Sequence, residues 1–487
     1  MMFLRAIPVV ILGAVLTGCS LAPSYERPDV GADVAAYTAP TVEVSAATIE
    51  SDIGAPQAWW RDFGSPELDA LVDEAFAANP DLTAAAARVL ETRAQFGGQR
   101  FNQLPSAEIG GTVARSKRNL AGFGIPRTIL STQWDVATQV AWEPDFWSRL
   151  SNTRKGAWAA FLASEANRHA VRQGLAADVV RTWLEVKQLE EQRDLGARTL
   201  ATYRHNEAIV LERYAAGVRP SLDVHLARQN VSAADAAQAQ RELDLANARR
   251  GLELLLGRYP AATVSIGTTS LADLPALPPI PVGLPSDLLE RRPDVVAAEM
   301  NLIGAHAREG AARAELFPRL TISGSAGWST PDEAQLFKDT TSVWSLVGNL
   351  AMPLLNRGAR KAAVGAAEAQ REQVRAAYVG TVLRAFRDVE TALDTDHAQR
   401  ERRDALQAGV RHAQRALEVA EDRYDQGLDP YLQVLDAQRR LLQTQSDLLR
   451  TEQGWRAARV NLIQALGGTW DESNDEQPAD ELVSATR

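Results

Sequence analysis

The side chains that could carry catalytic or metal chemistry do not form a recognised arrangement in this sequence. Its six histidines, at positions 169, 205, 225, 306, 397 and 412, are never three or four residues apart. No helix would therefore present two imidazoles to one metal ion. The sequence contains no nucleophile elbow, no phosphate-binding loop and no dinucleotide-binding glycine motif. The abundant acidic residues are typical of solvated helix faces. We expect no catalytic residue, no metal site and no cofactor.

One residue is placed for a covalent modification, the single cysteine Cys19. It follows a charged Arg5 and a short apolar run over residues 7–16, which together are typical of a secretory signal peptide. The small residues before this isolated cysteine resemble a bacterial lipobox, in which the cysteine becomes the lipidated first residue. We interpret residues 1–18 as a signal peptide and Cys19 as a lipid anchor. The alternative is an ordinary secretory signal with an incidental cysteine.

The bulk composition narrows the classes of partner. The formal net charge is −10 and the pI is about 5.3, which argues against nucleic acid, because phosphate binding needs a basic surface. With 45% hydrophobic and 23% charged residues, the chain is neither disordered nor a helical membrane protein. After the signal, no run of 18 apolar residues could form a transmembrane helix.

Two halves of the chain share one order of motifs. Asn79-Pro80-Asp81-Leu82 returns 213 positions later as Arg292-Pro293-Asp294-Val295, and Arg213-Tyr214-x-x-Gly217-x-x-Pro220 returns 210 positions later as Arg423-Tyr424-x-x-Gly427-x-x-Pro430. A proline-rich linker over residues 274–285 separates the halves, and neither a helix nor a central strand accommodates it. The sequence therefore predicts two copies of one structural plan.

Each half is predicted to contain a helix, a β-hairpin, a long helix and a shorter return helix. The long helices are proline-free, and at 1.5 Å per residue each would reach about 100 Å. Glycine and then proline, at the positions of a helix C-cap and of the next helix start, mark the turn in each half. The predicted division is an N-terminal lipid-anchored and equatorial segment over 19–65; a first repeat over 66–273, with helix 66–103, hairpin 105–143 and helices 150–216 and 220–257; the linker 274–285; a second repeat over 286–467, with helix 286–316, hairpin 318–353 and helices 358–427 and 430–467; and a C-terminal tail over 468–487.

The two predicted hairpins alternate apolar and polar residues with a period of two. In residues 132–143 one face carries Trp134, Val136, Val140 and Trp142, and residues 319–329 behave in the same way, while 105–115 and 342–353 are weaker copies. One such segment alone would fit a half-buried strand of a soluble sheet. Four segments of about 10 residues behind a lipoprotein signal favour membrane strands. Four strands cannot close a barrel, so several chains must share one; two chains would give eight strands and three would give twelve.

At this point the residues resemble the outer-membrane factor (TolC-like) family, in its lipoprotein branch that serves resistance–nodulation–division (RND) multidrug efflux pumps. The resemblance spans nearly all of the mature chain. Its carriers are Leu21-Ala22-Pro23-Ser24-Tyr25-Glu26-Arg27-Pro28 after Cys19, Trp59-Trp60-x-x-Phe63, Asn79-Pro80-Asp81-Leu82, Trp142-Glu143-Pro144-Asp145-Phe146, Arg292-Pro293-Asp294, both Arg-Tyr-x-x-Gly turns, Leu435-Asp436-Ala437-Gln438-Arg439 and Leu466-Gly467-Gly468-Thr469-Trp470.

The resemblance implies a fold class that is mixed but mainly α. Four strands per chain would join a trimeric 12-stranded outer-membrane β-barrel, which continues into a long periplasmic α-helical barrel. It implies the outer-membrane channel of a tripartite efflux system, a homotrimer in contact with outer-membrane lipid. The implied partners are a periplasmic adaptor (membrane fusion) protein and an inner-membrane RND-type transporter.

The resemblance also places a periplasmic gate at the turns between helices. Asp223 and Tyr424 match a locking hydrogen-bonded pair. Asp436 matches one of two acidic ring positions, and Gln433 occupies the other. Another lock of the family uses a basic residue where this chain has Asp429. The turns themselves, with Gly217, Val218, Gly427 and Leu428, would be the tips that contact the adaptor. For each aspartate the alternative is a solvated charge near a helix start.

Two other functions fit parts of the sequence. An exit duct for type I protein secretion shares the fold, and the lipobox favours the small-molecule branch only in part. A non-transporting periplasmic coiled-coil lipoprotein would explain Cys19 and the helices but would leave the four strands without a role.

Overall fold

The computed structural model describes residues 22–29, 38, 58–119, 128–275, 277–278, 280 and 288–468. The predicted signal peptide, Cys19 and the tail from residue 469 onward lie outside these residues. Contacts divide the chain into two compact units. The strand unit takes Met1–Pro28, Ala87–Glu165 and Ala297–Val379, and the helix unit takes Asp29–Ala86, Ala166–Val296 and Gly380–Arg487. Each unit therefore draws on both halves of the sequence.

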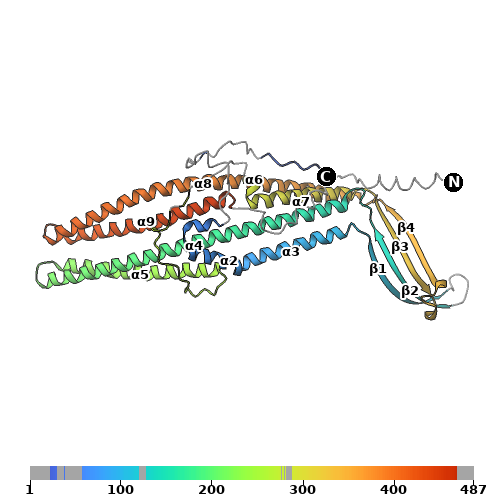
Figure 1. Ribbon diagram of the computed structural model, residues 1–487, viewed down its shortest axis with the longest axis horizontal. Helices are drawn as coiled ribbons and strands as arrows, with labels where there is room; N and C mark the ends of the chain where they lie inside the picture. The colour runs from blue at the N-terminus through green and yellow to red at the C-terminus, as the bar shows by residue number, and fades with distance from the viewer. Residues whose placement is uncertain are drawn as a thin grey trace. The chain divides into compact units, whose positions relative to one another are not determined.

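The structure is mainly helical, with one four-stranded sheet (Figure 1). The sequence predicts one helix at the start of each repeat. The structure has two helices in each of these places, because the helix is interrupted at Asn79 and at Arg292. The elements are η2 Trp59–Phe63, α2 Pro66–Ala78, α3 Pro80–Phe101, β1 Ser106–Asn119, β2 Thr128–Trp142, α4 Arg149–Ala215, α5 Ser221–Leu255, α6 Leu288–Arg291, α7 Pro293–Ala314, β3 Arg319–Thr330, η5 Glu333–Gln335, η6 Asp339–Thr341, β4 Ser342–Ala351, α8 Arg357–Asp425 and α9 Tyr431–Ala465.

The interruption at Asn79 is a helix cap that also makes a long-range contact. Asn79 is extended, with φ −68° and ψ 126°, and its side-chain oxygen accepts from the backbone N–H of Asp81 and Leu82 at 2.9 and 3.1 Å. Pro80 suits the first turn of α3, because it has no N–H to leave unpaired. The Asn79 amide donates to the carbonyl of Leu255 at 3.0 Å. The start of α3 is thereby fixed to the end of α5.

The second half uses the same joint with a different side chain. Arg292 is paired with Asp294 at 2.8 Å and donates to the carbonyl of Ala465, at the end of α9, at 3.1 Å. Glycine follows the return helix in both halves. Gly257 and Gly467 have φ +70° and +94°, and a Cβ on them would approach the carbonyl oxygens of Ala78 and Arg291 to 2.6 and 2.9 Å. Both joints therefore need glycine for its conformation and for the close approach.

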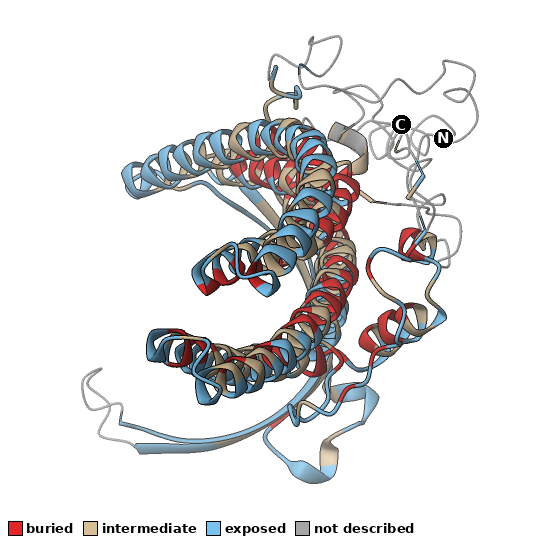
Figure 2. Cartoon of the chain, turned by 90° about the vertical axis from the view of Figure 1, so that its left-hand side faces the viewer, coloured by how far each residue is buried: buried red, intermediate tan, exposed pale blue. Residues whose placement is uncertain are grey.

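The sheet has the antiparallel strand order β1-β2-β3-β4. Its register places most large apolar residues of the four strands on one face, because Val113 pairs with Trp134, Val136 with Trp328, and Ala326 with Trp344. The two edge strands β1 and β4 are exposed along their whole length, whereas β3 and the middle of β2 are mostly half-buried. The exposed parts of the strands are pale blue in Figure 2. Among the described residues, no helix or strand packs over β1 or β4 to bury them.

The core of the helix unit surrounds Trp183 of α4. Phe63 of η2 packs edge-to-face on the Trp183 ring, with centroids 6.4 Å apart, and both side chains are fully buried. The chain after α5 returns to this core, where Leu271 and Leu274 are buried. The segment that leads into the predicted proline-rich linker is therefore packed against the helices.

A buried arginine of α9 holds this segment in place. Arg456 is 3% exposed, and its guanidinium donates to the carbonyls of Leu271, Leu274 and Pro275 at 2.8, 3.0 and 3.2 Å. Burial lowers the pKa of Arg456. Three carbonyls thus find their donor in one side chain, as buried backbone oxygens without a strand or helix partner require.

Replacing Arg456 by Met should release this segment. Three buried carbonyls would lose their donor, at a cost of about 1–3 kcal/mol each. We expect limited proteolysis of the purified protein to cut near residues 271–275 much faster in R456M. Arg450→Met is the matched control, since Arg450 of the same helix is exposed and pairs with Asp447 on the surface of that helix. Equal cleavage rates in R456M and the wild type would contradict this assignment.

Candidate functional site

The turns between the long and return helices have the same geometry in both halves. Gly217 and Gly427 adopt φ +72° and +73°. The next amide bonds back across the turn, from Val218 to the Arg213 carbonyl and from Leu428 to the Arg423 carbonyl, both at 2.9 Å. This is the left-handed helix end that glycine favours. A Cβ on either glycine would meet nothing within 4 Å, so backbone conformation alone explains the glycines.

Both turns expose apolar side chains. Val218 is 69% exposed and Leu428 is 61% exposed, and Leu222 and Leu432, which follow them on α5 and α9, are 62% and 55% exposed. The two turns lie at the same end of the helix unit (Figure 1). A pair of exposed apolar tips is a surface suited to contact with another protein.

The structure brings Asp223 and Tyr424 into one buried region at these tips. Their exposures are 8% and 5%. Tyr424 packs on Tyr431 with ring centroids 5.3 Å apart, in a cluster that includes Val210 and Val224. The Tyr424 hydroxyl has no hydrogen-bond partner among the described residues. The predicted hydrogen bond between the pair is therefore not formed in this structure.

A residue that the sequence reasoning did not select lies beside this pair. Arg219 donates to the backbone carbonyl of Tyr424 at 2.9 Å, and its guanidinium carbon is 4.3 Å from the centroid of the Tyr424 ring. Burial raises the pKa of the Asp223 carboxyl, and the positive charge of Arg219 opposes that shift. A comparison of the two repeats could have identified Arg219 from the sequence, because Arg219 occupies the position that Asp429 has in the second repeat.

The other predicted gate residues are on the surface of α9 or in its turn. Gln433 and Asp436 are exposed. Asp436 pairs with Arg440, one helical turn further on, at 2.8 Å. Asp429 pairs with Arg423 of its own turn at 2.6 Å, and Arg423 holds the pKa of Asp429 below its usual range. Both aspartates are thus paired with an arginine of their own hairpin.

The sheet carries a connected set of polar groups on the face opposite its tryptophans. Gln133 donates to the Ser329 hydroxyl at 2.7 Å, and Ser329 donates to Asp135 at 2.5 Å. The hydroxyls of Ser325 and Ser345 are 2.9 Å apart. One apolar and one hydrogen-bonding face fit a sheet that separates lipid from water.

The residues that follow Cys19 are docked on α7 in the strand unit. Glu299 is 6% exposed and accepts from the Tyr25 hydroxyl at 2.8 Å and from two nitrogens of Arg27 at 2.8 and 2.9 Å. Burial and the nearby Glu299 carboxylate raise the pKa of Tyr25. A Cβ at Gly310, further along α7, would come within 2.6 Å of Ala22. Residues 22–27 form an anchor segment with a defined seat.

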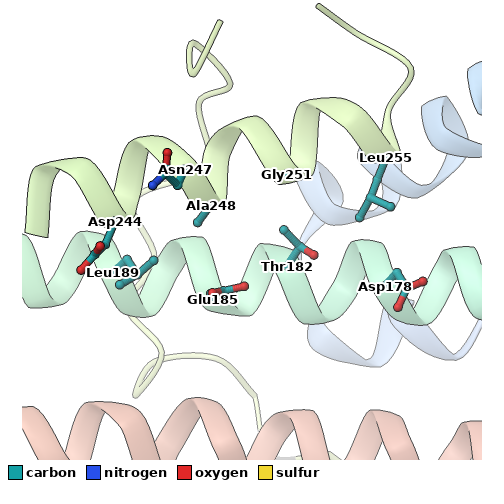
Figure 3. Close-up of a pocket in the computed structure, with 9 residues that line it drawn as sticks. All are labelled: Asp178, Thr182, Glu185, Leu189, Asp244, Asn247, Ala248, Gly251 and Leu255. Atoms are coloured by element: carbon teal, nitrogen blue, oxygen red, sulfur yellow. The ribbon is translucent and has the colours of Figure 1, made fainter. Parts of the chain in front are cut away.

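A hollow of about 700 Å³ lies between α4 and α5. In Figure 3 its side chains come from both helices, with Asp178, Glu185 and Asp244 among them. Asp178 pairs with Arg181 at 2.5 Å. The lining holds no histidine, cysteine or serine. Within the described parts of the chain there is also no cluster of His, Cys, Asp and Glu that could hold a metal ion.

Among the described helices, none is both long enough and apolar enough to cross a membrane.

Comparison with known proteins decides the family. A sequence profile described as "Outer membrane efflux protein" matches residues 71–258 and again residues 284–468. The chain belongs to this outer membrane efflux protein family. The family profile thus recognises each half once, in agreement with the internal repeat.

Individual members of the outer membrane efflux protein family match nearly the whole chain. Outer membrane protein OprJ of Pseudomonas aeruginosa is 32% identical over 469 residues, which cover 96% of each chain. The solvent efflux pump outer membrane protein SrpC of Pseudomonas putida is 32% identical over 479 residues, 97% of this chain and 99% of SrpC. The structure resembles the open-state MtrE outer membrane channel of Neisseria gonorrhoeae with a TM-score of 0.82 and 28% identity, over 92% of this chain and 98% of MtrE. The expected family and fold class are confirmed.

Glu299→Gln should loosen the anchor segment. The amide keeps the shape of the side chain but leaves Arg27 without its anionic partner, which costs roughly 1–3 kcal/mol. We expect faster hydrogen exchange in residues 22–29, measured by mass spectrometry. Glu315→Gln serves as the control. The Glu315 side chain is half exposed, and its nearest arginine nitrogen, on Arg360, is 3.9 Å away, which is a weak ion pair. Unchanged exchange in E299Q would show that other contacts hold the segment.

Proposed function

We propose that this chain is the outer-membrane exit channel of a tripartite efflux system that exports drugs or other small molecules. The single observation that supports this most strongly is the sheet register, which gathers most large apolar residues of the four strands on one face and a set of hydrogen-bonded polar residues on the other. A full-length match to efflux-pump outer membrane proteins supports the same function. No observation favours protein secretion or a purely structural role.

The sheet also supports assembly as a homotrimer. β1 and β4 each have a neighbour on one side only, and unpaired backbone groups in lipid cost several kcal/mol each. Pairing β4 of one chain with β1 of the next removes these edges. Eight strands from two chains would enclose only side chains, whereas twelve strands from three chains leave room for a passage.

Further contacts in the proposed system follow from the other sites. The exposed apolar tips at Val218 and Leu428 would meet a periplasmic adaptor protein, behind which an inner-membrane RND-type transporter supplies the driving force. Asp223, Tyr424, Gln433 and Asp436 remain our proposed gate residues. The proposed lipid on Cys19 would lie within about 11 Å of Ala22, since three residues reach no further. Docking on α7 would therefore fix where the anchor enters the membrane.

The decisive experiment combines assembly, conduction and export. We expect the detergent-purified protein to run as a trimer, to form pores in planar bilayers and to co-purify with an adaptor and a transporter. A deletion strain should become more sensitive to drugs and recover with the wild-type chain. A monomer that stays water-soluble without detergent, apart from its lipid, would contradict the proposal.

The two faces of the sheet should respond differently to charge. Val136→Lys places a charge on the apolar face, which costs about 2–4 kcal/mol near the middle of the membrane. Gln139→Lys, three residues along the same strand, places it on the polar face. We expect V136K to be lost from the outer-membrane fraction and Q139K to remain there, as measured by membrane fractionation and immunoblotting. Equal loss of both variants would argue that β2 does not face lipid.

A further inference from the structure

The two helical hairpins of the helix unit carry different charges at equivalent tip positions. Positions 213 and 423 are both arginine, but position 219 is arginine where position 429 is aspartate. Position 215 is alanine where position 425 is aspartate. The first tip therefore presents Arg213 and Arg219 without a carboxylate between them, while the second tip presents Asp425 and Asp429 around Arg423.

This difference changes where each arginine finds a partner. In the second tip Arg423 closes on Asp429 of its own turn, with nitrogen–oxygen distances of 2.6 and 3.2 Å. In the first tip the residue at the equivalent place is Arg219, which repels Arg213 instead of pairing with it. Arg213 reaches across to Asp425 of the second hairpin at 3.0 Å. The arginine of the second tip thus pairs within its own hairpin, whereas the equivalent arginine of the first tip pairs with the other hairpin.

Arg219 makes the second and less exposed link. Besides its hydrogen bond to the Tyr424 carbonyl, its guanidinium stacks over the Tyr424 ring, with the carbon 4.3 Å from the centroid. The guanidinium of Arg213 lies 5.2 Å from the centroid of the same ring. Tyr424 is almost completely buried, so these cation–π contacts are shielded from water and salt more than a surface ion pair is.

We propose that Arg219, assisted by Arg213, clasps the first helical hairpin to Tyr424 of the second and so resists separation of the tips. The inference rests on the proposed channel function and adds a positioning residue to its gate. Arg219 contacts the ring and the backbone carbonyl of Tyr424. The clasp differs in this from a lock built on a hydrogen bond between the Tyr424 hydroxyl and Asp223.

The test is the open probability of purified trimers in planar bilayers, without adaptor or transporter. Arg219→Gln should raise it about fivefold or more, because the charge that binds the ring and the neighbouring carboxylates is lost. R219D should have at least as large an effect, because Arg213 would then find a carboxylate in its own turn. R423Q is the matched control, with the same charge change at the tip in a residue that pairs within its own hairpin, and it should conduct as the wild type does.

A substitution of Tyr424 tests whether Arg219 acts through the aromatic ring. Tyr424→Leu removes the ring on which the guanidinium stacks, so it should raise the open probability, and adding R219Q to Y424L should raise it little further. An unchanged open probability in R219Q, or effects of R219Q and Y424L that multiply in the double variant, would overturn the clasp. Wild-type protein that forms neither trimers nor pores would instead contradict the channel function itself. If R219Q fails to assemble, R219K keeps the charge but loses the planar stack. It should then give a smaller rise, and no rise at all would equally overturn the clasp.

Discussion

The unpaired edges of the four-stranded sheet are the constraint on which the rest of this structure depends. Among the described residues, β1 and β4 each leave one row of backbone groups without a strand partner, and the sheet carries most of its large apolar residues on one face and hydrogen-bonding residues on the other. A lipid environment suits the first face and forbids the open edges. Pooling of strands from several copies satisfies both conditions. The trimeric channel that we propose follows from this requirement.

The helical part solves a related problem by repetition. In each half the start of one helix, α3 or α7, is fixed to the end of the return helix, α5 or α9. Asn79 does so through Leu255 and Arg292 does so through Ala465, and in both joints a glycine allows the backbones to approach. Different side chains thus make the same contact, because the backbone groups that need partners are the same. The buried Arg456 serves the chain between the halves in the same way.

The proposed gate lies where the two repeats differ in sequence. Most of the tip geometry is shared, including the left-handed glycines and the bonds across each turn. The first tip has Arg219 where the second tip has Asp429, so the two tips carry opposite charges at this position. Arginines of one hairpin then act on the other, while Asp429 and Asp436 are occupied within their own hairpin. A contact between hairpins can be broken without unfolding either of them, which is what a gate requires.

The sequence by itself determined the elements that depend on local chemistry. Period-two alternation located the four strands, proline-free runs located α4, α5, α8 and α9 to within two residues at each end, and the Gly-x-x-Pro spacing located both tips. It did not show that the helices opening each repeat are interrupted, because the partners of Asn79 and Arg292 lie some 170 positions away. It placed Asp223 and Tyr424 near each other but missed Arg219, whose role depends on which hairpin lies beside it. Only the tertiary structure decides such pairings, since spacing along the chain fixes where a side chain starts and packing fixes what it meets.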